Sequence, residues 1–404
     1  MFSKTIFFHL FILFPFFFQS QCGDRYQDEL FSSVTVSTVN YSDVYNDFRH
    51  EMDIYIPDND TVTNRPVIVY MHGGAFTSGS KNSIDCVDFC NYFAKRGYVA
   101  ISSNYRLSNN PILFATSRQN QYETVMKSVS DIKAVVRYLR KDYTLGNSLG
   151  IDSSSIFVGG YSAGAVLAIH LAYIDDVNDL PTAPINAQNI FNNLGGMEGD
   201  AGNYGYSSLV SGVISFAGGI NELNWIDSTD EPLFSVHGSN DLVVNYNCGP
   251  GLNIPTVFTL CGAAETHPKA TSVGVINDFI TYNGVGHSWP ASGSNNPLFS
   301  NALDSAKTFL FPLLSCNNNV GFFEINKNSV SQFPNPANSI VYYNSDEVII
   351  SYSVYNAIGK KINTEYINNN QFSFNVSDFK EGLYHVELES TEGVFFFNKL
   401  IVSH

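Results

Sequence analysis

The chain has 404 residues, of which 44% are hydrophobic and only 14% are charged. This composition supports a large core and excludes a disordered polypeptide, and the length predicts one large domain followed by a small one. The formal net charge of −16 argues against nucleic acid and anionic membrane surfaces as partners, because both attract basic proteins.

The first 21 residues have the pattern of a secretory signal peptide. Lys4 provides a positive charge, residues 5–18 are mainly Phe, Ile and Leu, and Ser20 is a small residue near a plausible cleavage point. The apolar run is shorter than the ~20 residues that a membrane span needs. We therefore expect export without stable membrane insertion. Lipidation at Cys22 is the less favoured alternative, because the residues before it do not resemble a lipidation signal.

Export permits disulfides. The six cysteines are Cys22, Cys86, Cys90, Cys248, Cys261 and Cys316. Cys248 and Cys261 flank a Gly/Pro-rich loop and are the expected pair, whereas Cys86 and Cys90 could form a local bridge or remain buried thiols. No zinc spacing is present, so we interpret all six as structural and expect no metal and no cofactor.

Strands and helices alternate along the first three quarters of the chain. The predicted strands include 33–39, 51–56, 66–71, 98–102, 210–216, 232–238 and 279–282. The predicted helices include 86–96, 122–141 and 301–314, the second of which has apolar residues at helical spacing. The alternation predicts the α/β fold class, with a mainly parallel sheet and helices on both faces.

Residues 155–165 have the pattern of a nucleophile elbow. A β-branched and aromatic run ends in Gly160-Tyr161-Ser162-Ala163-Gly164, and a helical pattern follows. G-x-S-x-G between a strand and a helix puts the serine in a strained turn at a helix N-terminus, where glycines leave room for neighbouring chain. Ser162 is therefore the predicted nucleophile. The alternative is an ordinary strand–turn–helix with a chance match.

A glycine pair follows the predicted strand at 66–71 directly, in His72-Gly73-Gly74-Ala75-Phe76. An acyl-transfer enzyme must stabilise an oxyanion with fixed backbone N–H groups, and glycines allow the backbone to come close to a substrate. We expect the N–H groups of Gly73, Gly74 and Ala163 to form the oxyanion hole. A glycine-rich turn without this role is the alternative.

Several motifs together resemble the α/β-hydrolase superfamily, and within it secreted carboxylesterases of the hormone-sensitive-lipase and bacterial feruloyl-esterase type. They are His72–Phe76, Gly79–Lys81, Asn104–Leu107, Ser130–Lys133, Gly150–Asp152 and Gly160–Gly164. The resemblance covers residues 33–314, with Ala75 where many relatives have a third glycine. It implies an eight-stranded sheet and ester hydrolysis without a cofactor.

The acid and the base of such an enzyme must follow the serine in the order Asp, His. The run from His237 to Val244 matches the H-G-x-x-D-x-x-V arrangement that the family has at its catalytic acid, which identifies Asp241. The rivals Asp227, Asp230 and Asp278 have no comparable position at a strand end.

The predicted base is His287. It lies in a glycine-containing loop after the last predicted strand and before the helix predicted at 301–314, where the family has its base. We interpret His72 and His237 as residues that hold loops, and His267 as an ordinary surface residue.

Residues 175–208 are rich in Asn, Gly and Pro, with a short predicted helix at 187–194. A loop of this length is usually functional, and we expect it to form a lid or a pocket wall above the carboxyl edge of the sheet. Gly195–Asp200 contains acidic residues but lacks the spacing of a calcium loop.

The character of the chain changes after Cys316. A polar linker leads into short alternating segments, which predict a small all-β sandwich. The predicted strands are 340–344, 348–355, 361–367, 371–376, 382–389 and 394–402. This region resembles the C-terminal sorting domain of type IX secretion in Bacteroidota. The matching pieces are Pro334–Ala337, Gly359–Lys361, Phe379–Tyr384 and Lys399–Val402. A carbohydrate-binding sandwich is the alternative.

These predictions divide the chain into a signal peptide (1–21), an α/β-hydrolase catalytic domain (22–316), a linker (317–330) and a sorting domain (331–404). The expected protein is a secreted or cell-surface serine esterase, with a small-molecule or polymer-linked ester as substrate and the type IX machinery as partner. A catalytically inactive binding or adhesion module and, less favoured, a serine peptidase are the alternatives. The acyl and alcohol groups of the ester stay open.

Overall fold

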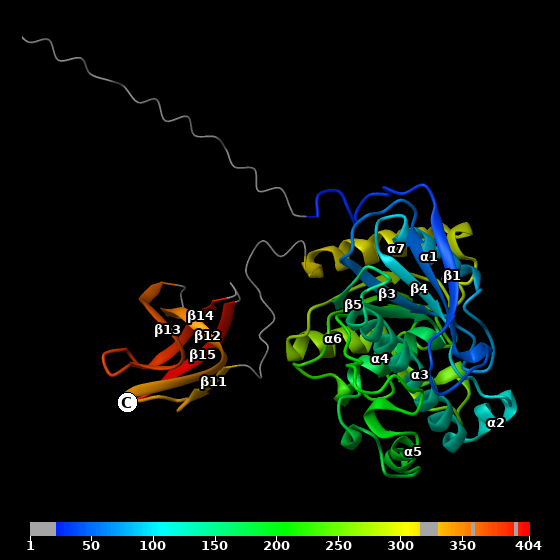
Figure 1. Cartoon of the computed structure of the whole chain (residues 1–404). Helices are drawn as coiled ribbons and strands as arrows, with labels where there is room; N and C mark the ends of the chain where they lie inside the picture. Colours follow the sequence, from blue (N-terminus) through cyan, green and yellow to red (C-terminus); the bar gives the residue numbers. More distant parts are fainter. Residues whose placement is uncertain (1–21, 316–329, 357–359, 392–394) are drawn as a thin grey trace, which may run out of the picture. The chain divides into compact units, whose positions relative to one another are not determined.

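The computed structural model describes residues 22–315, 330–356, 360–391 and 395–404 (Figure 1). The predicted signal peptide, Cys316 and almost all of the predicted linker lie outside the described residues. The chain divides into two units, one up to Asn319 and one from Val320 onward.

The first unit is built on an eight-stranded sheet with the order β1-β2-β4-β3-β5-β6-β7-β10. The strands are β1 (Val34–Asn40), β2 (Glu51–Pro57), β3 (Arg65–Met71), β4 (Val99–Ser103), β5 (Ile151–Tyr161), β6 (Val213–Phe216), β7 (Leu233–Gly238) and β10 (Asn277–Tyr282). Strands β4 to β10 in this order run parallel, and β2 is antiparallel to both β1 and β4. The carboxyl ends of the parallel strands therefore share one edge of the sheet.

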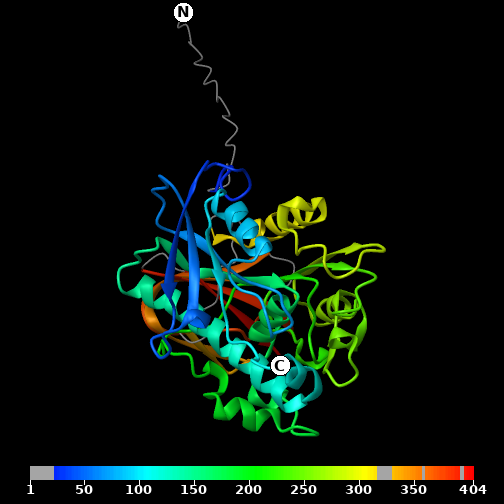
Figure 2. The same cartoon turned by 90° about the vertical axis from the view of Figure 1, so that its right-hand side faces the viewer.

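Helices cover both faces of this sheet (Figures 1 and 2). The helices are α1 (Ile84–Ala94), α2 (Pro111–Thr116), α3 (Arg118–Thr144), α4 (Ala163–Tyr173), α5 (Ala187–Asn193), α6 (Ala263–Val273) and α7 (Pro297–Leu310). The fully buried strand β3 shows why both faces need a cover, because its successive side chains point to opposite faces of the sheet. Val67 and Val69 join the apolar cluster of α3 and α4, whereas Ile68 and Tyr70 join that of α1 and α7. The predicted α/β fold class is confirmed.

Three local features differ from the sequence predictions. Helices α2 and α6 and the short hairpin of β8 (Cys248–Pro250) and β9 (Thr259–Cys261) were not expected. Helix α6 contains Pro268, which interrupts the usual helical pattern. The prediction that His267 is a surface residue is wrong. It lies in α6, is 1% exposed and has its Nδ1 2.9 Å from Asn277 Oδ1.

The predicted disulfide between Cys248 and Cys261 is present. Cys86 and Cys90 are free and buried, which decides between the two alternatives for that pair. Cys22 also takes part in a disulfide. In the part of the chain that the structure describes, no helix combines the length and apolar character of a membrane span.

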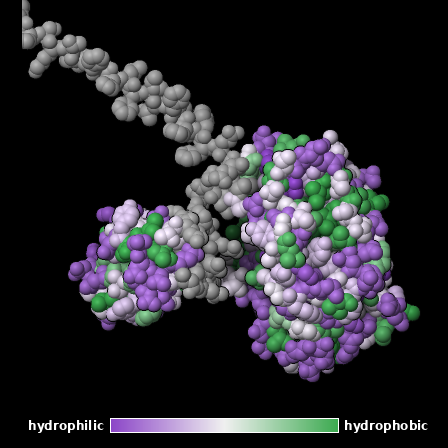
Figure 3. Space-filling model, in the orientation of Figure 1, coloured by the Kyte–Doolittle hydropathy of each residue, from purple (hydrophilic) through white to green (hydrophobic). Residues whose placement is uncertain are grey.

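The second unit is an antiparallel β sandwich. Its strands are β11 (Val330–Phe333), β12 (Ile340–Asn356), β13 (Lys361–Asn375), β14 (Gly382–Ser390) and β15 (Phe395–Val402). Two pairs of predicted short strands are each one long strand, β12 and β13. A register shift between Asn344 and Ile349 marks the place where the sequence pattern suggested a turn. On the faces of both units that Figure 3 shows, apolar and polar residues are interspersed.

Candidate active site

Ser162 lies between the last residue of β5 and the first residue of α4. Its φ of 55° is in the left-handed region, which costs a non-glycine residue free energy and is typical of functional turns. Two close approaches require the glycines of the elbow. A Cβ on Gly164 would lie 2.1 Å from the Met71 carbonyl oxygen, and one on Gly160 would lie 2.7 Å from the same atom. The two glycines therefore allow the end of β3 to lie in close contact with the elbow.

The structure brings the three predicted triad residues together. His287 Nε2 is 2.7 Å from Ser162 Oγ, and His287 Nδ1 is 2.6 Å from Asp241 Oδ2. The serine follows β5, the aspartate follows β7 and the histidine follows β10. All three thus come from loops at the carboxyl edge of the sheet, which is where open α/β sheets bind ligands.

Asp241 is buried and surrounded by donors. Its Oδ1 accepts hydrogen bonds from the N–H groups of Val243 (2.8 Å) and Val244 (3.0 Å). His237 Nε2 lies 3.3 Å from Oδ2 and donates to the Val244 carbonyl at 2.9 Å. Burial by itself would raise the pKa of Asp241, but the hydrogen bonds from His237 and His287 outweigh it and lower the pKa to about 2. The group is a carboxylate throughout the neutral range.

The predicted oxyanion loop is held by hydrogen bonds to its carbonyl groups. Tyr105 Oη donates to the His72 carbonyl at 2.7 Å, and His72 Nδ1 donates to the Gly73 carbonyl at 2.7 Å. Because peptide units are planar and trans, these bonds also fix the directions of the Gly73 and Gly74 N–H groups. Burial lowers the pKa of His72 to about 4, so the ring stays neutral.

Ala163 fits the predicted donor set, and Ala75, which is not part of that set, directly follows the glycine pair. Ala163 is the first residue of α4, so its N–H is one of the helix-end donors that have no partner within the helix. Ala75 has a φ of 53°, which explains why a glycine suits this position.

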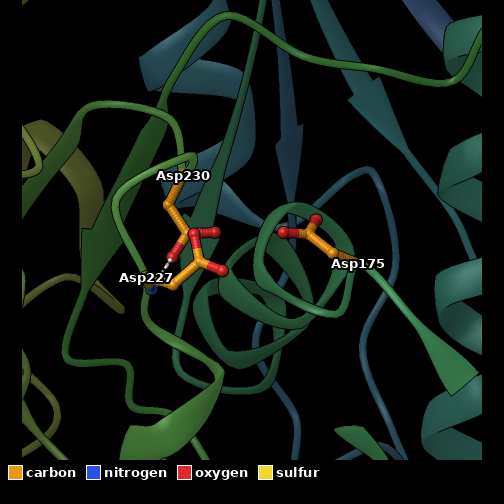
Figure 4. Close-up of side chains that lie close together, drawn as sticks. All are labelled: Asp175, Asp227 and Asp230. Carbon is orange, nitrogen blue, oxygen red and sulfur yellow. Dashed lines mark hydrogen bonds between the residues drawn. The ribbon is translucent and has the colours of Figure 1, made fainter. Parts of the chain in front are cut away.

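The sequence rivals of Asp241 lie elsewhere. Asp278 is exposed on β10, and its Oδ1 accepts from the Phe279 N–H. Asp227 and Asp230 gather with Asp175 just beyond the C-terminus of α4, the opposite end of that helix from Ser162 (Figure 4). Their carboxylate oxygens lie within 4.8 Å of one another.

This acidic group has the chemistry of a possible cation site, but two of its three members are exposed. Burial, with a smaller effect of the neighbouring carboxylates, raises the pKa of Asp230 to about 7. Among the described residues nothing else at the group points to an ion, and acidic clusters on a surface are common. We assign no metal to it.

The long segment 175–208 does not have the position predicted for a pocket wall. Its glycine-rich part is fastened to α3, where Lys133 Nζ donates to the Met197 carbonyl and Arg137 Nε donates to the Gly202 carbonyl. Asp200 pairs with Arg106 and accepts from Ser130, so it serves an ion pair and not a calcium loop. None of residues 175–208 lines the pocket at Ser162.

That pocket was missed by the sequence predictions. It is lined by Ala75, Phe76, Phe114, Ser162, Ala163, Val166, Val243, Val244, Gly251, Leu252, Val257, Phe258 and Leu260. Phe114 comes from α2, which begins with Asn110 as N-cap and Pro111 at its first position. This pair of residues is a helix-start signal and could have revealed the helix.

Comparisons with known proteins agree with both units. Residues 52–221 match a family model described as BD-FAE, and residues 331–403 match the secretion system C-terminal sorting domain. A neuroligin-like protein, glit-1 of Caenorhabditis elegans, is 29% identical over 116 residues. These are 28% of this chain and only 14% of that protein.

Solved structures share the fold of the first unit. The apo form of Thermogutta terrifontis esterase 2 is 21% identical, with a TM-score of 0.50, and the match covers 71% of this chain and 96% of that one. A truncated carbohydrate esterase from gut microbiota is 20% identical, with a TM-score of 0.50, and the match covers 70% of this chain and 97% of that one. The chain thus combines an esterase-like α/β-hydrolase domain with a type IX sorting domain. Such a domain directs proteins of Bacteroidota to the cell surface or the outside.

Proposed function

We propose that the chain is a secreted serine esterase that hydrolyses carboxylic esters through Ser162, His287 and Asp241. One observation carries the proposal: the unbroken series of contacts from Ser162 Oγ through the imidazole to the Asp241 carboxylate, at 2.7 and 2.6 Å. A nucleophile, its base and the group that orients the base lie in the order that acyl transfer needs.

In the proposed reaction, Ser162 Oγ bonds to the ester carbonyl carbon while its proton passes to His287 Nε2. The carbonyl oxygen becomes an oxyanion, which the N–H groups of Gly73, Gly74 and Ala163 stabilise. When the intermediate collapses, the alcohol leaves with the proton from His287 and the acyl group stays on Ser162.

Water completes the cycle by the same route. It attacks the acyl carbon and gives its proton to His287, which returns it to Ser162 Oγ as the carboxylic acid leaves. The carboxylate of Asp241 holds the Nδ1 proton and stabilises the imidazolium in both halves. The type IX machinery is the proposed partner of residues 331–404, through the sorting domain.

The test uses the purified full chain with p-nitrophenyl butyrate. Wild type should hydrolyse the ester, and Ser162→Ala should lose about 10⁴-fold or more in kcat while its circular dichroism is unchanged. A fluorophosphonate probe should label wild type at Ser162 and leave the variant unlabelled. A folded wild-type chain that neither hydrolyses esters nor takes up the probe would support the inactive binding module instead.

A further inference from the structure

A disulfide-closed loop forms much of the pocket beside Ser162. The Cys248–Cys261 loop, as we name residues 248–261, contains β8, a short turn at Gly251–Asn253 and β9, and its two cysteines lie opposite each other in the hairpin. Five of its residues line the pocket: Gly251, Leu252, Val257, Phe258 and Leu260. No member of the proposed triad lies in this loop.

The composition of the pocket indicates an uncharged ligand. Apart from Ser162, each of its lining side chains is apolar or a glycine. Phe114, Val244 and Phe258 are each at least 95% buried, so the walls are part of the packed core. A charged group in such a site would lose its hydration without a partner, which costs several kcal/mol.

The position of the pocket separates the two halves of an ester. Ser162 and Ala163 line it, but His287 does not. The alcohol oxygen must receive its proton from His287 Nε2, so the alcohol has to lie on the histidine side of Ser162. The group that enters the pocket is therefore the acyl chain, which stays bonded to Ser162 Oγ after the alcohol has left.

Bulky side chains narrow the space that this chain can enter. Phe76, Phe114, Phe258 and Leu260 line the pocket and are each at least 95% buried. Because side chains packed into a core cannot easily move aside, each further methylene is accommodated less well. We therefore expect acetyl and butyryl groups to fit better than an octanoyl chain.

We propose that the Cys248–Cys261 loop is the specificity wall of an acyl pocket that admits short, uncharged acyl groups. This inference rests on the proposed esterase function and adds the substrate class and the element that sets it. The acyl–serine bond forms and breaks as in the reaction above, and the loop takes no part in the chemistry.

Several attachments hold the wall in place. Cys261 exchanges backbone hydrogen bonds with Ile220 at 2.8 and 3.0 Å. Cys248 is exposed and is tied to Cys261 by the disulfide. Gln121 of α3 is fully buried, donates to the Thr256 carbonyl at 3.2 Å and accepts from the Phe258 N–H at 3.1 Å. Opening the disulfide removes the covalent tie of the Cys248 side, which carries Leu252. That side is then held by weaker bonds, such as the hydrogen bond from the Leu252 N–H to the Val243 carbonyl at 2.7 Å, and we expect it to yield more easily to a longer acyl chain.

The test measures kcat/KM of the full chain for p-nitrophenyl acetate, butyrate and octanoate. Wild type should prefer acetate and butyrate over octanoate by about tenfold or more, because excess methylenes in a packed pocket cost at least that much. Leu252→Ala enlarges the pocket and should raise the octanoate-to-butyrate ratio about tenfold. The double variant Cys248→Ser/Cys261→Ser should raise it in the same direction. Leu145→Ala, which removes an exposed leucine outside the pocket, is the matched control and should leave the ratio unchanged.

The outcomes separate the two proposals. If Ser162-dependent hydrolysis occurs but wild type accepts octanoate as well as butyrate, or Leu252→Ala leaves the ratio unchanged, the wall assignment is wrong and the esterase stands. If wild type hydrolyses none of the three esters, or Ser162→Ala hydrolyses them equally well, both proposals are overturned. Leu252→Ala keeps the disulfide, so it decides the question even where the double variant does not fold.

Discussion

Replacing Asp241 by asparagine tests the proposed mechanism most directly. The oxygen of the new amide can keep the hydrogen bonds from Val243 and Val244, which Asp241 Oδ1 accepts in the wild-type chain. The NH₂ group of the amide then faces His287 Nδ1. An amide donates there, so the imidazole must carry its proton on Nε2, next to Ser162 Oγ. In this tautomer the histidine cannot accept the serine proton.

The expected loss follows from that change of tautomer. A wrong tautomer with intact geometry costs a triad enzyme about 10⁴-fold in kcat, or about 5 kcal/mol of transition-state stabilisation. Because the pKa of Asp241 is about 2, wild type keeps its carboxylate at every pH from 5 to 8. The ratio of wild-type to variant kcat should therefore not fall towards one at the acidic end of this range.

The assay is the pH–rate profile of p-nitrophenyl butyrate hydrolysis by wild type, Asp241→Asn and Asp227→Asn at constant ionic strength. Asp227 is the matched control, since it lies beyond the other end of α4. An Asp241→Asn protein that keeps more than about a tenth of wild-type kcat would refute the reasoning. A comparable loss in Asp227→Asn would mean that the acidic group acts on the site.

Two further predictions concern groups around the site. Tyr105→Phe removes the hydrogen bond to the His72 carbonyl, which holds the oxyanion loop. It should lower kcat about tenfold with little change in KM, because the loss falls on the oxyanion donors. A variant that loses stability but keeps the wild-type kcat would show that the bond is purely structural. Asp85, 3% exposed in α1, has its pKa raised by burial to about 7, with a smaller contribution from Asp88. Burial favours the neutral form of this carboxyl group in the folded state. Its contribution to the free energy of unfolding is therefore complete below the unfolded pKa of 3.8 and is lost as the pH rises through 7. The side chain of Asp85→Asn stays neutral at every pH. The free energy of unfolding of the variant, relative to that of wild type, should therefore rise by about 3 kcal/mol from pH 5 to pH 8. Urea unfolding followed by tryptophan fluorescence measures this difference, and a difference that does not change with pH would contradict the buried-carboxyl argument.

Much of the fold could be predicted because its signals are local. The apolar run of β3 and the G-x-S-x-G elbow report burial and turn geometry within a few residues. The three triad positions follow from their places after strands in a fixed chain order. The pocket wall has no such signal. Phe114 and Phe258 lie far apart in sequence. Tertiary hydrogen bonds bring α2 and the Cys248–Cys261 loop to one place: those of Gln121 with Phe114 and Phe258, and that of Thr256 with Ala115.

Some misses arise from local signals that tertiary packing overrides. Pro268 argues against a helix, yet α6 forms around it because Ala270 and His267 are buried against the sheet. The segment 175–208 looks like a lid from its composition. Charged side chains of α3 instead hold its carbonyl groups, an arrangement that composition cannot reveal.

Two aspartates on either side of β7 show how surroundings assign roles to one residue type. Asp230 precedes the strand, stands among other carboxylates and has its pKa raised to about 7. Asp241 follows the strand, accepts two backbone N–H groups and faces two imidazoles, which lower its pKa to about 2. A group that must stabilise a transient imidazolium has to be charged before the proton moves. Of these two carboxyl groups, only the one with donors on every side meets that condition, which is why the proposed mechanism assigns the role to Asp241.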